Sequence, residues 1–344
     1  MATIRDVARE SGVSVTTVST VLNNAPRPVN DATRAKVLDV ARRLHYVPTA
    51  SAIRLVKGKS QVIGMAFPNV ETSLVTNYNA AKVLAGVLSV AAEEGYVVQL
   101  NPQPWAGGAA GVSQVRATGV DGVLLLWPSR TSDQTDELAK SGIPVVVIAA
   151  SANSSSTLAT SVDVENIHGG RLAAEHLIHL GHRKAIYVAG ALGQESVHHR
   201  YQGFCDVFEE QNLPKPEMIG FSFDPTTVDQ TTDEHFRQCK DATAYFATND
   251  SLALSIIRIA ADHGLHTPKD ISVVGFDDAP FAQHTSPMLT SFVVNMDTIA
   301  ETAMRQLIRL ISGQSVEKVS MPPKLVLRES TAAVRSVAEP QIPQ

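Results

Sequence analysis

Residues 3–24 constrain this chain more than any other stretch, because they have the pattern of two short helices joined by a tight turn. Gly12 can adopt the positive φ that a sharp turn needs, and the small side chain of Ala8 lets a second helix approach closely. Ser14 stands where an N-cap is preferred, directly before a helix that opens at Val15. The spacing predicts a helix-turn-helix, whose second helix enters the DNA major groove. A plain helical hairpin shares this periodicity, so other features must decide between the two.

The distribution of charge favours the nucleic-acid alternative. The first 60 residues hold ten Lys or Arg and four acidic residues, which gives a net charge of +6. The whole chain carries −5, so the remaining 284 residues carry −11. A basic head on an acidic body is expected when only the head contacts phosphate. A solvated charged surface, the alternative explanation, is common for one helix but less common over a whole 60-residue segment.

Length and composition exclude several classes of protein. The 344 residues exceed the usual size of one domain, and a hydrophobic content of 44 % is enough for more than one core. The two cysteines, Cys205 and Cys239, lack the spacing of a metal site and suit a reducing compartment. An acidic residue occurs by position 6, and the longest apolar run, 143–150, has eight residues. Neither a signal peptide nor a membrane helix is therefore expected, and we predict a cytoplasmic protein with no metal and no cofactor.

A third helix and a short linker complete the predicted head. Asn30 can cap a helix over about residues 31–45, and Pro48 ends this region because it disfavours helix at the preceding residue. Residues 1–48 then form a self-contained all-α domain. Residues 49–60 form a linker with room for two helical turns, and so short a helix is marginal in water unless a partner holds it.

From residue 61 the pattern changes to short apolar strands that alternate with amphipathic helices. Such alternation is typical of α/β folds in which helices cover parallel sheets, and this segment is too long for one small sheet. We expect two lobes, 61–161 plus 292–323 and 162–291 plus 324–335, and a ligand beyond the carboxyl ends of the strands. The tail, 336–344, is expected to be disordered. The expected strands cover 62–67, 96–100, 122–126, 145–148, 184–188, 218–221, 244–247 and 272–276, and the expected helices cover 80–94, 169–180, 201–211, 251–263 and 298–312.

The order of these parts resembles the lactose/galactose repressor (LacI/GalR) family of bacterial transcription regulators. The resemblance covers about residues 2–335 and rests on many short motifs in the same order. After the head motif TIRDVARESGVSVTTVSTVLN these are GVDGV (119–123), GIPV (142–145), NIHGGR (166–171), HLIHLGHR (176–183), RYQGF (200–204), ATND (247–250), PKDISVVGFDD (268–278) and PMLTS (287–291). The family implies a DNA-binding head, a hinge helix, a two-lobed effector domain like that of periplasmic binding proteins, and a homodimer.

The resemblance implies which residues contact DNA. Val15, Thr16 and Thr20 would meet base edges, and Leu55 of the hinge would wedge into the minor groove. Thr20 replaces an arginine that is common in the family, so we expect an altered base preference there. The other polar residues of this helix would contact phosphate, or would simply be solvated. The expected set is Thr3, Ser14, Val15, Thr16, Thr17, Ser19, Thr20, Asn23, Ala52 and Leu55.

The resemblance also implies an effector pocket in the body. Arg200 precedes Gly203 by three residues, as the effector-binding arginine of the family does. Arg200, Asn249 and Asp277 together suit a polyol, because each sugar hydroxyl is both donor and acceptor. After Pro68 the chain departs from the family pattern, which argues against copying a ligand from any one relative. The expected pocket residues are Arg200, Asn249, Asp277, Phe223, Ser196 and Tyr78.

We therefore expect a homodimeric transcriptional regulator, most simply a repressor, that binds a pseudo-palindromic operator and responds to a sugar. Control by a protein partner, or by a nucleobase or nucleoside, stays open. An enzyme is disfavoured because the chain has no Gly-rich phosphate loop and residues 193–197 fail the spacing of a nucleophile elbow. A periplasmic solute-binding protein would need a signal peptide and no basic head. Neither the effector nor the direction of regulation follows from the residues.

Overall fold

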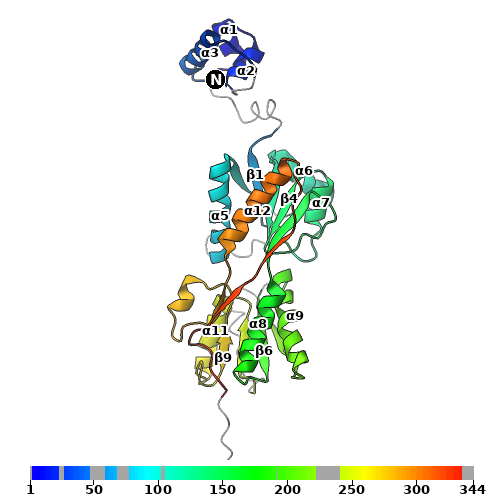
Figure 1. Ribbon diagram of the computed structural model, residues 1–344, viewed down its shortest axis with the longest axis vertical. Coiled ribbons are helices and arrows are strands. Elements are labelled where there is room, and N and C mark those ends of the chain that lie inside the picture. Colours follow the sequence, from blue (N-terminus) through cyan, green and yellow to red (C-terminus); the bar gives the residue numbers. More distant parts are fainter. Residues whose placement is uncertain are drawn as a thin grey trace, which may run out of the picture. The chain divides into compact units, whose positions relative to one another are not determined.

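The computed structural model describes residues 2–22, 27–46, 59–67, 77–101, 105–190, 192–221 and 241–334. The chain divides into two compact units (Figure 1). The head unit comprises residues 1–62 with 118–121, and the body comprises 63–117 with 122–344. The predicted linker, except for its last two residues, and the predicted tail lie outside the described residues.

Three helices build the head, as the sequence predicts: α1 (Ile4–Ser11), α2 (Val15–Leu22) and α3 (Asp31–Arg43). The turn before α2 depends on Gly12, which has a φ of 67°. Asn30 caps α3 by accepting from the Thr33 amide at 2.7 Å. The core of the head is a cluster of small apolar side chains from all three helices, namely Val7, Ala8, Val18, Val21, Val37, Val40 and Ala41.

The first lobe of the body contains a six-stranded sheet in the order β11-β5-β4-β3-β1-β2. Neighbours from β11 to β1 pair in parallel, as predicted for strands with apolar runs. Its strands are β1 (Val62–Ala66), β2 (Val97–Asn101), β3 (Gly122–Leu126), β4 (Val145–Ile148), β5 (Ala159–Val164) and β11 (Val319–Met321). Its helices are α5 (Tyr78–Glu94), α6 (Gly108–Thr118), α7 (Gln134–Lys140) and α12 (Met296–Ile311), of which α5 and α12 pack together (Figure 1).

The second lobe contains a four-stranded parallel sheet in the order β7-β6-β8-β9. Its strands are β6 (Ala185–Gly190), β7 (Glu217–Phe221), β8 (Ala244–Ala247) and β9 (Ser272–Val274). Its helices are α8 (Asn166–His179), α9 (Glu195–Glu210), α11 (Asp250–Asp262) and the short 3-10 helix η1 (Pro280–Gln283). Both lobes thus have the predicted α/β class with parallel sheets.

The described chain passes between the lobes three times. One passage follows β5, and the other two run through β10 (Ser291–Val293) and β12 (Lys324–Val326), which pair antiparallel. The lobe boundary predicted at about residue 161 falls inside β5 (Ala159–Val164). This strand pairs with β4 through Val162 and with β11 through Val164, so the first lobe extends to residue 164. The hydrophobicity pattern did not predict this strand, because it contains two polar residues that are nevertheless buried, Ser161 and Asp163.

His182 fastens the last described segment of the chain to the second lobe. Its side chain is 3 % exposed, and its ring nitrogens lie 2.9 Å from the hydroxyls of Thr243 and Ser272. Its Nε2 also lies 3.2 Å from the carbonyl oxygen of Ala332. Burial lowers the pKa of His182 to about 4, and the neighbouring His176 and Arg183 add to this effect, whereas the Ala332 carbonyl opposes it.

Acid is therefore expected to destabilise the body through His182. Between pH 4 and 6.5 the unfolded chain binds a proton at this residue that the folded chain does not, so the free energy of unfolding falls as the pH falls. At pH 5 this loss is about 2 kcal/mol relative to pH 7.5. Urea titrations of wild-type protein and His182→Gln at both pH values should show a smaller loss in the variant.

The comparison isolates His182. The raised pKa values of Asp250 and Asp277 increase the free energy of unfolding as the pH falls, but both proteins contain these two residues, so this effect is the same in each. His284→Gln, at an exposed histidine, is the control and should behave as the wild-type protein does. Equal pH dependence in His182→Gln and wild-type protein would contradict the assignment.

Candidate functional site

Helix α2 has a polar, exposed first turn that its capping residue holds in place. The Ser14 hydroxyl accepts from the Thr17 amide at 3.1 Å, as predicted for an N-cap, and lies 2.9 Å from the Thr17 hydroxyl. Val15 and Thr16 are exposed, whereas Thr17 and Ser19 are half-buried. An exposed first turn is what a recognition helix presents to base edges.

Helix α1 begins at a capping box. Exposed Thr3 donates to the Asp6 carboxylate from its amide at 2.9 Å and from its hydroxyl at 2.7 Å, and the Asp6 amide is directed at the Thr3 hydroxyl. These bonds, with Arg9 beside the carboxylate, lower the pKa of Asp6. Thr3 is therefore a structural cap in the free protein, and a phosphate contact would be an additional role. Asn23, Ala52 and Leu55 lie outside the described residues.

Thr20 departs from the prediction that it shares an exposed surface with Val15 and Thr16. Its side chain is 7 % exposed, and its hydroxyl donates to the Thr16 carbonyl at 2.9 Å. The physical reason is that Thr20 lies on the same helix as Val18 and Val21, next to the face that packs into the core of the head. In the free head, therefore, Val15 and Thr16 are presented to solvent and Thr20 is not.

Asp121, which the sequence analysis quoted in a motif but gave no role, holds the end of the linker. One carboxylate oxygen accepts from the amide and the hydroxyl of Ser60 at 2.7 and 2.8 Å, and the other accepts from the Gln61 amide at 2.7 Å. The Asp121 amide donates to the Val62 carbonyl at 2.8 Å. The last linker residues are thus fixed where β1 begins. The one signal in the sequence is an acidic residue between glycine-containing turns of the GVDGV motif.

Arg200 is the centre of the candidate effector site in the body. Its guanidinium carbon lies 3.6 Å from the centroid of the Phe276 ring. Its Nε donates to the Asn166 side-chain oxygen at 2.9 Å, and its Nη1 donates to the Thr248 carbonyl at 2.6 Å. Burial lowers the pKa of Arg200, and the Asp277 carboxylate opposes this shift. The arginine therefore stays charged and oriented, with part of its donor set left for a ligand.

Asp277 faces this arginine from the loop after β9. Burial raises the pKa of Asp277 to about 6, although the Arg200 charge and a hydrogen bond from Asn79 oppose the shift. Its amide donates to the Phe292 carbonyl at 3.0 Å, and its φ is 108°. A carboxylate beside a guanidinium supplies acceptors next to donors, which is the requirement for binding vicinal hydroxyls.

The remaining predicted pocket residues have different surroundings. Asn249 caps α11, since its side-chain oxygen accepts from the Leu252 amide at 2.9 Å, which leaves its NH2 group and the second lone pair of that oxygen for a ligand. Ser196 is buried one turn before Arg200 on α9, which places both on one face of the helix. Tyr78 is half-buried at the start of α5, with the Lys82 ammonium 5.2 Å from its ring centroid. Phe223 lies outside the described residues.

Two residues of this site were missed by the sequence analysis. The Asn166 side-chain oxygen accepts the hydrogen bond from Arg200 Nε. The Asn166 NH2 group donates to the Val164 carbonyl at 3.0 Å, at the passage between the lobes. Asn79 of the first lobe lies close enough to Asp277 of the second to lower the pKa of that carboxyl, and the Asn79 side-chain oxygen is buried without a partner among the described residues. Asn166 belongs to the quoted NIHGGR motif, whereas Asn79 stands in the segment where the chain departs from the family pattern.

Comparison with known proteins agrees with this geometry. The model of the bacterial regulatory proteins of the lacI family matches residues 3–49, and that of the periplasmic binding protein-like domain matches residues 174–331. Catabolite control protein A of Priestia megaterium is 30 % identical over 337 residues, which cover 96 % of this chain and 99 % of that protein. The chain belongs to the LacI family.

Solved structures of LacI-family regulators share the fold. A Lac repressor dimer bound to operator and the anti-inducer ONPF matches with a TM-score of 0.82 and 28 % identity, over 96 % of this chain and 99 % of that chain. The transcriptional regulator CelR in complex with cellobiose matches with a TM-score of 0.70 and 26 % identity, over 96 % and 100 %. The resemblance drawn from the sequence and the predicted fold class are thus confirmed. The chain is a DNA-binding transcriptional regulator with a ligand-binding effector domain.

No described helix is long and apolar enough to cross a membrane. No group of three or more His, Cys, Asp or Glu side chains within the described ranges could hold a metal ion.

The exposure of α2 predicts which substitutions change operator preference. Val15→Ala and Thr16→Val should each alter the preferred sequence in a selection from random DNA duplexes, because both side chains are exposed on the first turn. Thr20→Val should leave the preference unchanged, because its hydroxyl is bound to the Thr16 carbonyl. A shift in Thr20→Val as large as that in Val15→Ala would show that Thr20 turns outward on DNA, as the resemblance implies.

Proposed function

We propose that this chain is a homodimeric repressor, acting on cytoplasmic DNA, whose affinity for a pseudo-palindromic operator is set by a neutral sugar bound beside Arg200. The observation that carries the proposal is the Arg200 guanidinium, which lies 3.6 Å from the centroid of the Phe276 ring and close enough to the Asp277 carboxylate for each to affect the pKa of the other. Donors, acceptors and an apolar ring at one point are the elements of a polyol site.

The charges around Arg200 favour a neutral ligand over an anionic one. Asp277 and Asp163 both lie close enough to Arg200 to affect its pKa, so its single positive charge is already compensated. A phosphate would bring further negative charge toward these carboxylates at a cost in free energy. The buried side-chain oxygen of Asn79 offers an acceptor from the first lobe, which a hydroxyl can satisfy. The cellobiose bound to the similar regulator CelR is a ligand of this class.

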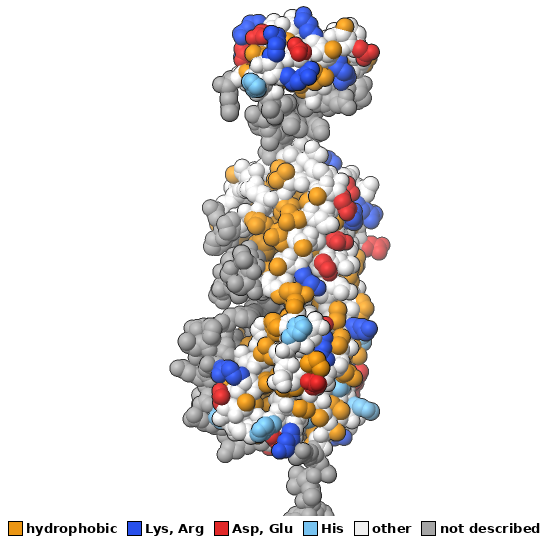
Figure 2. Space-filling view, turned by 90° about the vertical axis from the view of Figure 1, so that its left-hand side faces the viewer, with side chains coloured by type: hydrophobic (Ala, Val, Ile, Leu, Met, Phe, Trp, Pro, Cys, Tyr) orange, Lys and Arg blue, Asp and Glu red, His pale blue; other side chains and the backbone are white. Residues whose placement is uncertain are grey.

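The dimer would form through the first lobe. Strand β2 lies at one edge of its sheet, and Val97 and Leu100 on this strand are exposed, as is Leu88 on α5. Figure 2, which shows the side of the molecule that carries α5, has hydrophobic side chains gathered over this lobe. An edge strand with exposed apolar side chains favours association with a second copy. Two heads would then read two matching half-sites.

Thermal unfolding of the full chain tests the effector class. We expect a neutral mono- or disaccharide from a panel that includes cellobiose, glucose and ribose to raise the melting temperature in proportion to the logarithm of its concentration. At a concentration one hundred times Kd the stabilisation is about 2.7 kcal/mol. Arg200→Gln should abolish the shift. Arg171→Gln, which removes the Arg171–Glu210 ion pair of the same lobe, should keep it.

The same thermal measurement, with guanine and adenosine added to the panel, tests the alternative kinds of control. Stabilisation by guanine or adenosine, with no sugar active, would replace the sugar with a nucleobase or nucleoside. No stabilisation by any small molecule, together with unchanged operator binding, would instead favour control by a protein partner. Equal shifts in Arg200→Gln and wild-type protein would place the ligand elsewhere.

A further inference from the structure

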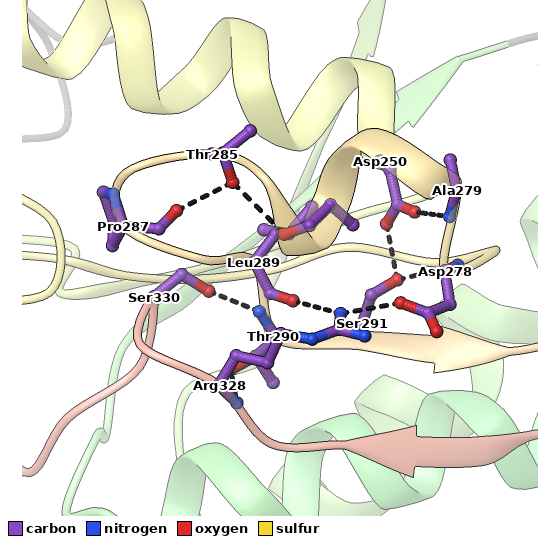
Figure 3. Close-up of polar contacts among 11 residues, drawn as sticks. Asp250, Asp278, Ala279, Thr285, Pro287, Leu289, Thr290, Ser291, Arg328 and Ser330 are labelled. Carbon is purple, nitrogen blue, oxygen red and sulfur yellow. Dashed lines mark hydrogen bonds and ion pairs between the residues drawn. The ribbon is translucent and has the colours of Figure 1, made fainter.

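A largely enclosed polar cluster joins the loop that carries Asp277, here called the pocket loop, to β10 and β12, the two crossover strands that pass between the lobes (Figure 3). We call it the crossover cluster; it consists of Asp250, Asp278, Ser291 and Arg328. Arg328 follows β12, Ser291 begins β10, and Asp278 directly follows the pocket residue Asp277. The cluster thus contains a neighbour of the pocket and a residue from each of the two passages.

The ion pair between Arg328 and Asp278 is the most enclosed of this type among the described residues. The Arg328 Nη1 lies 2.6 Å from an Asp278 carboxylate oxygen, and the two side chains are only 13 % and 21 % exposed. The same Nη1 donates to the Leu289 carbonyl at 2.7 Å, and the Arg328 amide donates to the Thr290 hydroxyl at 3.0 Å. Arg328 therefore holds three segments at once: its own, the start of β10 and the pocket loop.

Asp250 makes a parallel connection from α11. Its carboxylate accepts from the Ser291 hydroxyl at 2.5 Å and from the Ala279 amide at 2.6 Å. The Ser291 hydroxyl also accepts from the Asp278 amide at 3.2 Å. Asp250 follows Asn249, so each of the two predicted pocket residues Asn249 and Asp277 has an adjacent carboxylate that contacts Ser291 of β10 or Arg328 after β12.

These strands lead directly into the packing of the first lobe. After β10 the chain enters α12, which packs along α5. A Cβ at Gly86 of α5 would lie 2.4 Å from the Asp297 carbonyl of α12, so these helices are in backbone contact. Strand β12 follows β11, the edge strand of the first-lobe sheet. A shift of either crossover strand therefore displaces close-packed elements, which do not deform continuously.

We infer that Arg328, through its ion pair with Asp278, is a positioning residue that links occupation of the effector site to the arrangement of the two lobes. This inference rests on the proposed function for the identity of the ligand alone; the connection itself is present in the free protein. Arg328 contacts the pocket loop through Asp278, and the ligand would contact Arg200, Asn249 and Asp277.

Operator binding of the free, full-length protein tests the connection without any effector. The probe is a DNA duplex selected from a random pool on the wild-type protein, and the readout is Kd by fluorescence anisotropy well below the melting temperature. Arg328→Gln should weaken binding about tenfold, because a looser crossover lowers the fraction of chains in the binding-competent arrangement. Asp278→Asn should do the same, and the double variant should be no worse than either one.

Two controls separate positioning from general stability. Arg171→Gln removes an exposed ion pair that joins α8 to α9, and its operator Kd should stay within twofold of wild type. Arg328→Lys keeps the charge and should bind within threefold. If Arg328→Gln lowers the melting temperature but leaves Kd unchanged, the residue is merely structural and the inference is wrong.

A second readout uses the sugar from the thermal panel that stabilises the wild-type protein, with cellobiose tested first. The ratio of operator Kd values with and without this sugar should move toward one in Arg328→Gln, while the sugar still raises its melting temperature. An unchanged ratio contradicts the inference. If no sugar stabilises the wild-type protein, the proposed effector class fails, and the effector-free Kd values still decide the role of Arg328.

Discussion

The guanidinium of Arg200 lies against the ring of Phe276 and donates to the Asn166 side chain and the Thr248 carbonyl. These three partners come from the loop after β9, the end of β8 and the start of α8, so one side chain links two strand ends of the second lobe to the passage after β5. The carboxylates of Asp277 and Asp163 lie close enough to this buried charge to raise its pKa and so to compensate part of the cost of burial. The passage after β5 and the loop that carries Asp277 therefore both interact with the charge of Arg200.

The elements that could be predicted from the sequence are those with strong local signals. Strands β3, β4 and β8 are apolar runs, and their ends were predicted without error. Helix α3 has its cap at Asn30, as expected. Strand β5 was missed because Thr160, Ser161 and Asp163 are polar and yet buried, and three-residue strands such as β11 and β12 carry no period at all. Their pairing depends on partners far along the chain.

The functional residues, like the helices and strands, could be predicted from the sequence only in part. Motif spacing identified Arg200 and Asp277, and the structure brings them together. The family resemblance placed Thr20 with Val15 and Thr16 among the base-contacting residues, and the burial of Thr20 depends on how α2 packs in the head, which is a tertiary property. Asp121 and Asn166 are polar residues within short motifs, and their partners lie 61 and 34 residues away. The role of Asp250 was also hidden, since a helix N-terminus explains an aspartate without reference to a crossover strand.

The central claim is that a ligand beside Arg200 changes the arrangement of the two lobes. The most direct measurement is the distance between spin labels at two exposed positions, Gln114 on α6 and Glu175 on α8, after both native cysteines are replaced by serine. Dilution with unlabelled chain would leave each labelled chain beside an unlabelled one. We predict that the stabilising sugar shifts the distance distribution from one population to another, and that Arg200→Gln abolishes the shift. The same distribution with and without the saturating sugar would contradict the account.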